Sequence, residues 1–373
     1  MSCPLSGVCG GCPHRNKELS QYRHDKIAAV ERMLSSMPQP LPWGEPIFVA
    51  DGTRRRAALA FHFQRGRLTL GFNQFKSKDI VNVDTCLLLT PRLNAVLPWL
   101  RQLLYDICSE PCQLRKGKKN ITQIINSGDV WLCEADNGVD VVLEYDAPLG
   151  LNHRMIIFEA ASSAAEVVRI SHRRTNADTP EPIIEKSKPY LKIANTNVFI
   201  PAGTFLQPSK AGETALINLV LHYLNGVSGQ IFDLFCGVGT FSYPLAANPD
   251  NKIVAVDSSA ELLSGFQETV NRNQIPNIKI VARNLFKYPL DAAELQSAAA
   301  VVFDPPRAGA AAQTQMLAQA RPSKIIAVSC NPGTFANDAK VLLGVGYTLE
   351  QLTLVDQFTY SDHSELVALF TNK

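Results

Sequence analysis

No stretch of the 373-residue sequence is apolar for long enough to span a bilayer, and the N-terminus has no hydrophobic segment of the signal-peptide kind. Internal repeats and low-complexity tracts are absent, which excludes a repeat array. The net charge is only +2, so no excess of one sign indicates a nucleic-acid or membrane partner by itself. We therefore expect a monomeric globular protein of the cytoplasm with no membrane contact.

The composition is that of a chain with a large core and reactive thiols. The length of 373 residues is enough for two or three domains and a large core, and 46% of the residues are apolar. Its nine cysteines indicate metal binding or catalysis rather than disulfides in a cytoplasmic protein. Basic clusters at 54–56, 116–119 and 172–174 give modest support for contacts with phosphates in the middle of the chain.

The first 200 residues predict an α+β domain behind a cysteine-rich start. Apolar residues at helical spacing predict a helix from about Lys17 to Met37, and a proline-rich linker follows at 38–44. Short strands between Gly and Asn turns come next, interrupted by two helices. The strands are expected at 57–62, 67–72, 139–144 and 155–158, and the helices near 91–107 and 161–169.

After residue 200 strands alternate with helices, which predicts a doubly wound, mostly parallel sheet, the Rossmann-like architecture. We therefore divide the chain into a hook and helix (1–40), a middle α+β domain (41–200) and a C-terminal α/β domain (201–373). The C-terminal strands are expected at 230–235, 252–257, 278–282, 300–304, 324–329 and 365–370.

A glycine turn follows the first C-terminal strand and predicts a cofactor site. Gly237 and Gly239 allow a tight turn on which a ligand can lie against bare main chain. Asp257 ends the next strand, where a carboxylate can accept hydrogen bonds from ribose hydroxyls. A dinucleotide would fit such a turn too, but Ser242 stands where the third glycine of that fingerprint belongs. S-adenosylmethionine, which has no pyrophosphate, is favoured.

Two later strand ends carry the expected catalytic groups. Asp304 precedes Pro305-Pro306, which stop the strand and stiffen its loop. Cys330 follows a buried strand and precedes Asn-Pro, a position that favours a nucleophile over the commoner buried thiol. A thiolate that adds to C6 of uracil puts electron density on C5, so that C5 can accept a methyl group. Glu365 is the candidate base for the C5 proton, and His363 is a candidate polar contact.

Taken together, these residues resemble the bacterial RNA uracil-C5 methyltransferase family over nearly the whole chain. The resemblance implies that Cys330 is the nucleophile, that Glu365 is the proton acceptor, and that Phe205, Asp304 and His363 bind the base. The expected cofactor residues are Gln207, Phe235, Gly237, Gly239, Asp257 and Asp304. The motifs that carry it are Phe205-Leu-Gln207, Asp233-Leu-Phe-Cys-Gly-Val-Gly239, Asp304-Pro-Pro-Arg307, Ser329-Cys-Asn-Pro-Gly-Thr-Phe335 and His363-Ser-Glu365.

Cys3, Cys9 and Cys12 form a hook at the N-terminus, with Cys86 as a fourth candidate ligand. Four thiolates suit zinc or an iron–sulfur cluster equally well, and spacing alone does not choose. The family resemblance favours the cluster, because members with this hook followed by a later cysteine carry a [4Fe–4S] cluster. Zinc is the alternative. We expect the centre to be structural.

The resemblance also bears on the substrate. Many members begin with a small RNA-binding barrel ahead of the hook; since this sequence starts at the hook, we expect the middle domain to bind RNA. The uridine must be flipped out of the folded RNA to reach the pocket. Large-subunit ribosomal RNA is the expected substrate and transfer RNA the alternative. An amino-group methyltransferase or a non-catalytic RNA-binding factor are the rival functions.

Overall fold

The computed structural model describes residues 3–116, 119–175 and 178–372, without the side chains of 113–121. The chain forms two compact units. Unit 1 comprises residues up to Asn16, Ala50–Leu191 and Ile200–Ser209; unit 2 comprises Lys17–Val49, Lys192–Phe199 and Lys210 onwards. The segment Lys17–Val49, which contains the N-terminal helix, therefore forms one compact unit with the C-terminal part of the chain. The division into three functional domains stays a prediction.

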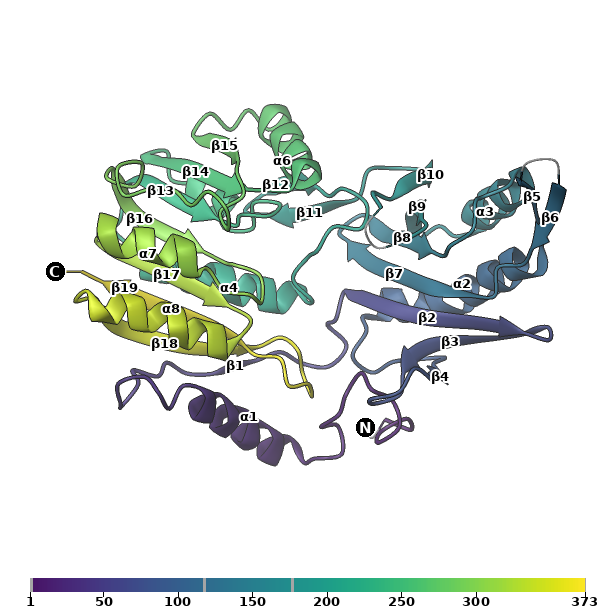
Figure 1. The fold of residues 1–373 in the computed structure, drawn as a ribbon, viewed down its shortest axis with the longest axis horizontal. Coiled ribbons are helices and arrows are strands. Elements are labelled where there is room, and N and C mark those ends of the chain that lie inside the picture. Colours follow the sequence, from purple (N-terminus) through teal and green to yellow (C-terminus); the bar gives the residue numbers. More distant parts are fainter. Residues whose placement is uncertain (1–2, 117–118, 176–177, 373) are drawn as a thin grey trace. The chain divides into compact units, whose positions relative to one another are not determined.

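Unit 2 is built on an eight-stranded sheet in the order β1-β18-β19-β17-β16-β13-β14-β15 (Figure 1). All neighbours are parallel except β19, which is antiparallel to both β17 and β18. The fold is the Rossmann-like class I methyltransferase fold, as predicted. The strands are β1 (Ile47–Phe48), β13 (Gly229–Leu234), β14 (Asn251–Asp257), β15 (Ile278–Ala282), β16 (Ala298–Phe303), β17 (Lys324–Ser329), β18 (Thr348–Asp356) and β19 (Glu365–Thr371).

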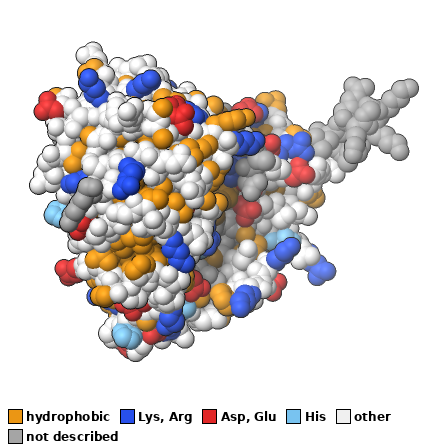
Figure 2. All heavy atoms as spheres, turned by 60° about the vertical axis from the view of Figure 1, so that its left-hand side comes forward, with side chains coloured by type: hydrophobic (Ala, Val, Ile, Leu, Met, Phe, Trp, Pro, Cys, Tyr) orange, Lys and Arg blue, Asp and Glu red, His pale blue; other side chains and the backbone are white. Residues whose placement is uncertain are grey.

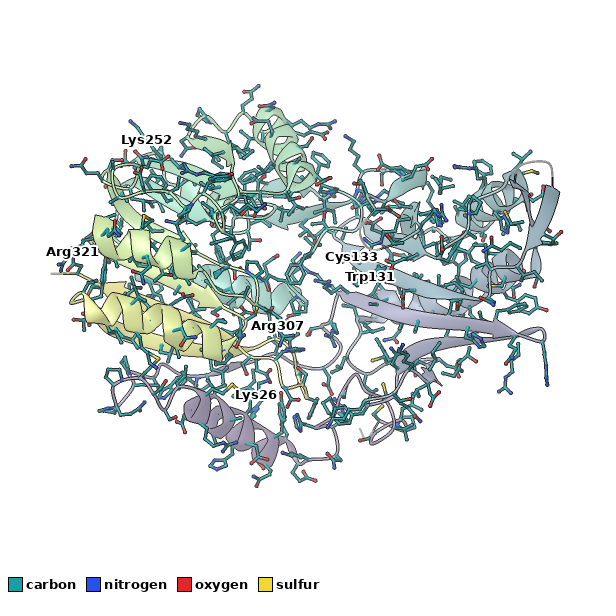
Figure 3. The ribbon with its side chains drawn as sticks, viewed as in Figure 1. Lys26, Trp131, Cys133, Lys252, Arg307 and Arg321 are labelled. Atoms are coloured by element: carbon teal, nitrogen blue, oxygen red, sulfur yellow. The ribbon has the colours of Figure 1, made fainter. Side chains whose placement is uncertain are left out.

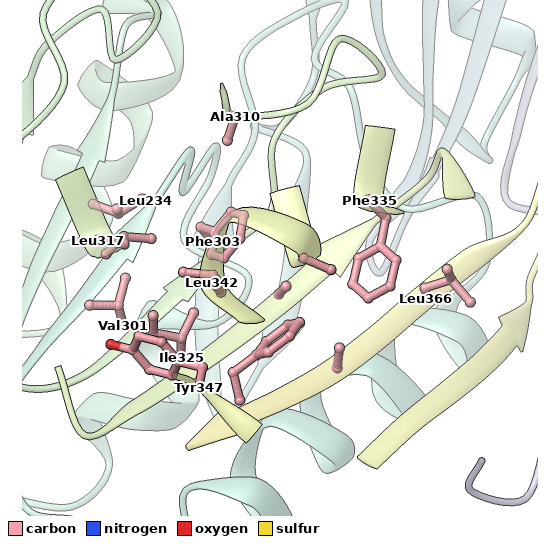
Figure 4. Packing of buried hydrophobic residues seen from close by; sticks show 14 of the residues in the cluster. Leu234, Val301, Phe303, Ala310, Leu317, Ile325, Phe335, Leu342, Tyr347 and Leu366 are labelled. Carbon is pink, nitrogen blue, oxygen red and sulfur yellow. The ribbon is translucent and has the colours of Figure 1, made fainter. Parts of the chain in front are cut away.

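Helices cover the sheet of unit 2 because its strands are apolar on both faces. Residues of α1, α7 and α8 share one core with the strands, in which Phe303, Ile325 and Leu366 of the sheet pack near Leu317 and Phe335 of the helices (Figure 4). Helix α4 packs against β18 and β19 outside that core. The helices of this unit are α1 (Leu19–Met33), α4 (Lys210–Tyr223), α5 (Ser242–Ala246), α6 (Ala260–Arg272), α7 (Ala311–Ala320) and α8 (Pro332–Gly344).

The topology of unit 2 brings several strand ends to one edge. The carboxyl ends of β13, β14, β16 and β17 meet there because these strands are parallel and in register, Leu234 pairing with both Val256 and Phe303. β13 lies between β14 and β16, where the strand order reverses, and ligands bind at such a switch point. Since β19 is antiparallel to β17, its first residue reaches the same edge, with Leu366 opposite Ser329.

Unit 1 contains a seven-stranded sheet in the order β10-β9-β8-β7-β2-β3-β4, antiparallel except for the β8–β9 pair. Its apolar face packs with α2 and α3 in one core, and Trp99 of α2 donates to the Ala160 carbonyl of α3 at 2.9 Å. The elements are β2 (Arg56–Gln64), β3 (Arg67–Asn73), β4 (Ile80–Asn82), α2 (Pro91–Ser109), β5 (Cys112–Lys116), β6 (Lys119–Gln123), β7 (Ser127–Ala135), β8 (Gly138–Glu144), α3 (Leu151–Ser163), β9 (Val167–Arg173) and β10 (Glu181–Glu185). A hairpin of β11 (Tyr190–Ile193) and β12 (Thr196–Phe199) follows in the sequence, and its residues Lys192–Phe199 belong to unit 2.

Two predicted elements of unit 1 are wrong. Residues 155–158 lie within α3 rather than in a strand, and 161–169 is not a helix, because α3 ends at Ser163 and β9 starts at Val167. His153, Ile157 and Ala161 are the buried residues of α3, a four-residue period that the short run Met155-Ile-Ile-Phe158 conceals. β18 was missing from the predicted strands altogether.

On the face shown in Figure 2, Lys and Arg side chains are interspersed with acidic and apolar ones. Part of the basic middle region is paired: Arg55 is buried, and Arg173 and Arg174 form ion pairs with Glu144 and Asp146. The lysines near 116–119 lie outside the described side chains. Among the described residues no helix is both long and apolar enough to cross a membrane.

Candidate active site

The glycine turn after β13 has the conformation that its residues predict. Gly237 and Gly239 have φ of 56° and 93°, and Phe235 also has a positive φ of 61°, a strained value for an aromatic residue. A Cβ at Gly237 would meet no atom within 4 Å, so open space lies over this residue. At Gly239 it would come within 2.7 Å of Phe266, which requires glycine for packing. A ligand can thus lie against the main chain at Gly237.

Asp257 is fixed beside this turn. One carboxylate oxygen accepts the Gly237 amide at 3.0 Å, and the other accepts the Ser259 amide at 3.0 Å. These bonds hold the end of β14 against the end of β13. Each carboxylate oxygen has a second lone pair, so Asp257 can still accept from a hydroxyl group.

Phe286 was not predicted as a site residue, yet it lies beside the turn. Its ring centroid is 5.4 Å from that of Phe235, and 46% of the residue is exposed. The Asn284 side chain accepts the Phe286 amide at 3.0 Å and shapes the turn after β15. An exposed ring next to open main chain offers a stacking surface for a flat heterocycle. In the sequence, Phe286 is marked only by being an aromatic residue four positions after the end of a strand.

Three carboxyl groups meet beneath this edge, and burial raises the pKa of each. The pKa of Asp304 is raised to about 7 by desolvation, and that of Asp233 to about 7 by desolvation and by the nearby charges of Asp304 and Asp257. Glu365 is only 3% exposed; desolvation, followed by repulsion from Asp304, raises its pKa well above the ordinary value. The cluster of three carboxyl groups therefore retains protons at neutral pH.

Gln357 orients Glu365. The Gln357 amide donates to the Glu365 carboxylate at 3.1 Å, and both residues are buried. Gln357 follows β18 and Glu365 opens β19, so this bond spans the ends of the loop that joins the two strands. Sequence analysis did not find Gln357, because its strand was not predicted.

Cys330 lies at the same edge, after β17, and is partly accessible. Its pKa is raised to about 11, first by desolvation and then by the charges of Glu365 and Asp304, while Arg307 opposes them. Asn331 fixes the turn that follows by accepting the Gly333 amide at 3.0 Å and donating to the Arg307 carbonyl at 3.1 Å. The predicted nucleophile, base and Asp304 therefore act on one another electrostatically.

The raised pKa of Cys330 predicts how the free protein reacts with iodoacetamide, which attacks the thiolate. Because the thiolate is the minor form below the raised pKa, the alkylation rate at Cys330 should rise about tenfold per pH unit from pH 8 to 10. Asp304→Asn removes one repelling charge and should increase the rate at pH 8. Peptide mass spectrometry measures the rate at this residue, and a plateau already reached at pH 8 would contradict the assignment.

His363 lies in the loop before Glu365. Its ring is exposed and stacks edge-on against Phe358, with centroids 5.5 Å apart, and its amide donates to the Ser361 hydroxyl at 3.2 Å. The side chain is accessible, so its predicted contact with the base stays a prediction.

Phe205 and Gln207 belong to unit 1, where arginines hold their segment. Arg55 donates to the Gln207 carbonyl at 2.9 Å, and Arg56 donates to the Leu206 carbonyl at 2.9 Å. The Arg56 guanidinium also stacks over the Phe205 ring at 4.3 Å. Phe205 is 62% exposed, so an aromatic surface remains accessible. Their roles in binding base and cofactor stay predictions from the family resemblance.

The four cysteines predicted as ligands line one cavity of unit 1 that is partly open to solvent. Arg15 and Arg54 line it too, and Gly10 donates to the Asn73 carbonyl at 2.9 Å, which ties the hook to the hairpin of β3 and β4. Desolvation and the neighbouring thiols Cys86 and Cys9 raise the pKa of Cys12 to about 12. Among the described residues no three or more His, Cys, Asp or Glu side chains converge closely enough to hold one metal ion. The predicted ligands are Cys3, Cys9, Cys12 and Cys86.

The fold resembles that of a known RNA-modifying enzyme. The crystal structure of Pyrococcus abyssi tRNA (uracil-54, C5)-methyltransferase in complex with S-adenosyl-L-homocysteine superposes with a TM-score of 0.74, covering 100% of this chain and 87% of that one, at 21% sequence identity. At this identity the likeness shows the fold.

Sequence relatives show the family. An uncharacterized RNA methyltransferase of Caulobacter vibrioides is 34% identical over 99% of this chain and 85% of its own length. The 23S rRNA (uracil(1939)-C(5))-methyltransferase RlmD of an Enterobacter species is 30% identical over 99% of this chain and 81% of its own length. The family described as tRNA (Uracil-5-)-methyltransferase matches residues 188–373. The chain is therefore an S-adenosylmethionine-dependent RNA uracil-C5 methyltransferase and belongs to this family.

Proposed function

We propose that the protein methylates C5 of a specific uridine through a covalent bond between Cys330 and C6 of the base. The observation that carries this proposal is that the strand order brings Cys330, Asp304 and Glu365 to the edge that also carries the glycine turn. An amino-group methyltransferase needs no thiol there. A non-catalytic RNA-binding factor needs none of the three.

The chemistry balances with the residues present. The Cys330 thiolate forms a bond to C6, and the electrons of the C5=C6 bond move to C5 and the O4 carbonyl as an enolate. S-adenosylmethionine would supply the methyl group that C5 accepts, and the break of its methyl carbon–sulfur bond leaves S-adenosylhomocysteine. Glu365 then takes the proton from C5, the electrons restore the C5=C6 bond, and the thiolate leaves. Glu365 must be ionised to take this proton, and in that form the burial that raises its pKa makes the carboxylate a stronger base than that of a surface glutamate.

Asp304 is proposed to hold the uracil N3–H, with its strand end stiffened by Pro305. The cofactor is proposed to lie against Gly237, with Asp257 accepting from its ribose and the Phe235–Phe286 pair offering the stacking surface. From the family resemblance we retain Gln207 as a cofactor contact and Phe205 as a contact with the base. His363 is retained as a polar contact.

We infer that the substrate is 23S ribosomal RNA, in the cytoplasm. Support comes from the 30% identity with enzymes named for this RNA over almost the whole chain. The test uses total RNA from a strain that lacks the protein, with S-adenosylmethionine labelled in its methyl group. We expect label in 5-methyluridine of the 23S fraction; label confined to transfer RNA would favour the alternative. Light scattering of the same preparation would test the expected monomer.

We also propose that the cysteine cavity holds a [4Fe–4S] cluster. Zinc requires four sulfurs about 2.3 Å from one atom, whereas a cluster binds each thiolate to a different iron. The four thiols share one cavity, and the family resemblance favours the cluster over zinc as its occupant. Arg54 lines the cavity, so a cation faces the negative charge that four thiolates would bring. Such a centre would fix the hook and supply no step of the methylation.

Anaerobic purification should give brown protein with about four irons and four sulfides per chain. Cys12→Ser should lose most of the colour and lower the melting temperature, because the hook loses its anchor. Cys108→Ser, which changes a thiol in α2 outside the cavity, should keep the iron content. Colourless protein with one zinc per chain would contradict the cluster.

A further inference from the structure

Two buried polar side chains of α1 reach the end of β18. Tyr22 and Lys26 are one helical turn apart and only 2% and 5% exposed. The Tyr22 hydroxyl donates to one carboxylate oxygen of Asp356 at 2.6 Å, and the Lys26 ammonium lies 3.2 Å from the other. Asp356 is fully buried and is the last residue of β18. α1 thus contributes a hydroxyl and a cation to the interior of unit 2.

The same two side chains hold the segment that follows, residues 357–364, here named the β18–β19 loop. Lys26 donates to the Ser361 carbonyl at 2.8 Å and to the His363 carbonyl, and its side chain extends from α1 to this loop (Figure 3). The Tyr22 hydroxyl accepts the Tyr360 amide at 2.8 Å, and the two tyrosine rings lie 4.7 Å apart. The loop is therefore fixed at its middle and near its end by one helix.

Both ends of the β18–β19 loop belong to the candidate active site. Gln357 directly follows Asp356, Glu365 directly follows the loop, and the two are hydrogen-bonded to each other. A change in the loop would therefore move the base together with the residue that orients it. A shift of about 1 Å in a catalytic group can reduce a rate about 100-fold.

Burying the charged ammonium of Lys26 costs desolvation free energy, and an apolar side chain could fill the same space without that cost. Desolvation lowers its pKa in spite of the opposing effect of Asp356. Replacing a buried ion pair by well-packed apolar residues is often neutral or stabilising, so stability alone is a poor reason to keep one. What the ammonium provides is several directed hydrogen bonds to one loop.

We propose that Tyr22 and Lys26 are positioning residues that hold the β18–β19 loop in the conformation in which Glu365 reaches the proton on C5. The inference rests on the proposed function, since it gives α1 a role in the step in which Glu365 removes the C5 proton and the thiolate leaves. The proposal adds a part of the molecule that lies outside the candidate active site, because none of the contacts described above joins α1 to Cys330 or to the glycine turn.

The test separates adduct formation from adduct release in Lys26→Met. Release needs Glu365, whereas trapping on RNA containing 5-fluorouridine needs only Cys330 and methyl transfer, because the fluorine at C5 cannot leave as a proton. We expect release from ordinary RNA to slow about 10- to 100-fold, so that methylated adduct accumulates. Trapping rate and cofactor affinity should stay within about twofold of wild type. Lys17→Met, which changes a half-buried lysine just before α1 that pairs with Asp25 at 2.6 Å, should behave as wild type.

Tyr22→Phe is the second variant, in case Lys26→Met does not fold. It keeps the ring against Tyr360 and removes only the hydroxyl, so release should slow in the same way but by less. Tyr105→Phe, an exposed tyrosine of α2, is its control. Wild-type release in either α1 variant, or an equal slowing of trapping and release, would overturn the inference. If wild-type protein itself traps no fluorinated RNA, the proposed function fails instead.

Discussion

Cys330→Ala is expected to abolish methyl transfer, with a loss of at least about 10⁴-fold in turnover, as when the nucleophile of a covalent enzyme is removed. Without the sulfur, C5 of uracil has too little electron density to accept a methyl group. Binding of S-adenosylmethionine should change less than about twofold, because Cys330 is not among the proposed cofactor contacts. Transfer of labelled methyl to 23S RNA measures the first quantity, and calorimetry the second.

The matched control is Cys133→Ala, which removes a thiol from β7 of unit 1. This variant should keep wild-type turnover. If Cys330→Ala retains more than a few per cent of the activity, the reaction does not pass through this cysteine, and methylation of an amino group becomes the better account.

Glu365→Gln should stop the reaction one step later. The substitution keeps the size of the buried side chain but removes the base, so the enzyme should form the methylated adduct and fail to resolve it. We expect turnover to fall about 10²- to 10⁴-fold, the usual contribution of a general base. Denaturing gels should then show a covalent protein–RNA band with ordinary RNA, which wild-type protein does not accumulate.

Glu350→Gln, on the exposed side of β18, provides the control and should turn over as wild type does. Wild-type turnover in Glu365→Gln would mean that another group removes the proton. Loss of activity without a covalent band would mean that Glu365 acts before methyl transfer.

The residues of the catalytic edge could be predicted from the sequence because each is marked by a short sequence pattern around it. Asp257, Asp304 and Cys330 each follow a short apolar run, and parallel strands carry such residues to one edge. Glu365 was predicted as the base because it opens a later strand, and the family resemblance implies the same role. The antiparallel direction of that strand, which brings Glu365 to this edge, was not predicted. The positions of these residues follow from the order of the strands.

Other features depend on contacts that no local pattern encodes. Phe286 becomes a candidate only because its ring meets Phe235, and Gln357 only because β18 pairs with β19. Lys26 looks like any surface lysine of an amphipathic helix until Asp356, 330 positions later, is placed beside it. The helix α3 was misread because its apolar residues run together at 155–158, where a strand and a helix look alike.

The most direct measurement is the mass of the peptide that contains Cys330 after the protein has reacted with 5-fluorouridine RNA and S-adenosylmethionine and the RNA has been digested. We predict a peptide heavier by one fluorinated nucleotide carrying one methyl group, with the bond at the sulfur of Cys330. An unmodified Cys330 peptide from a preparation that methylates ordinary RNA would contradict the account.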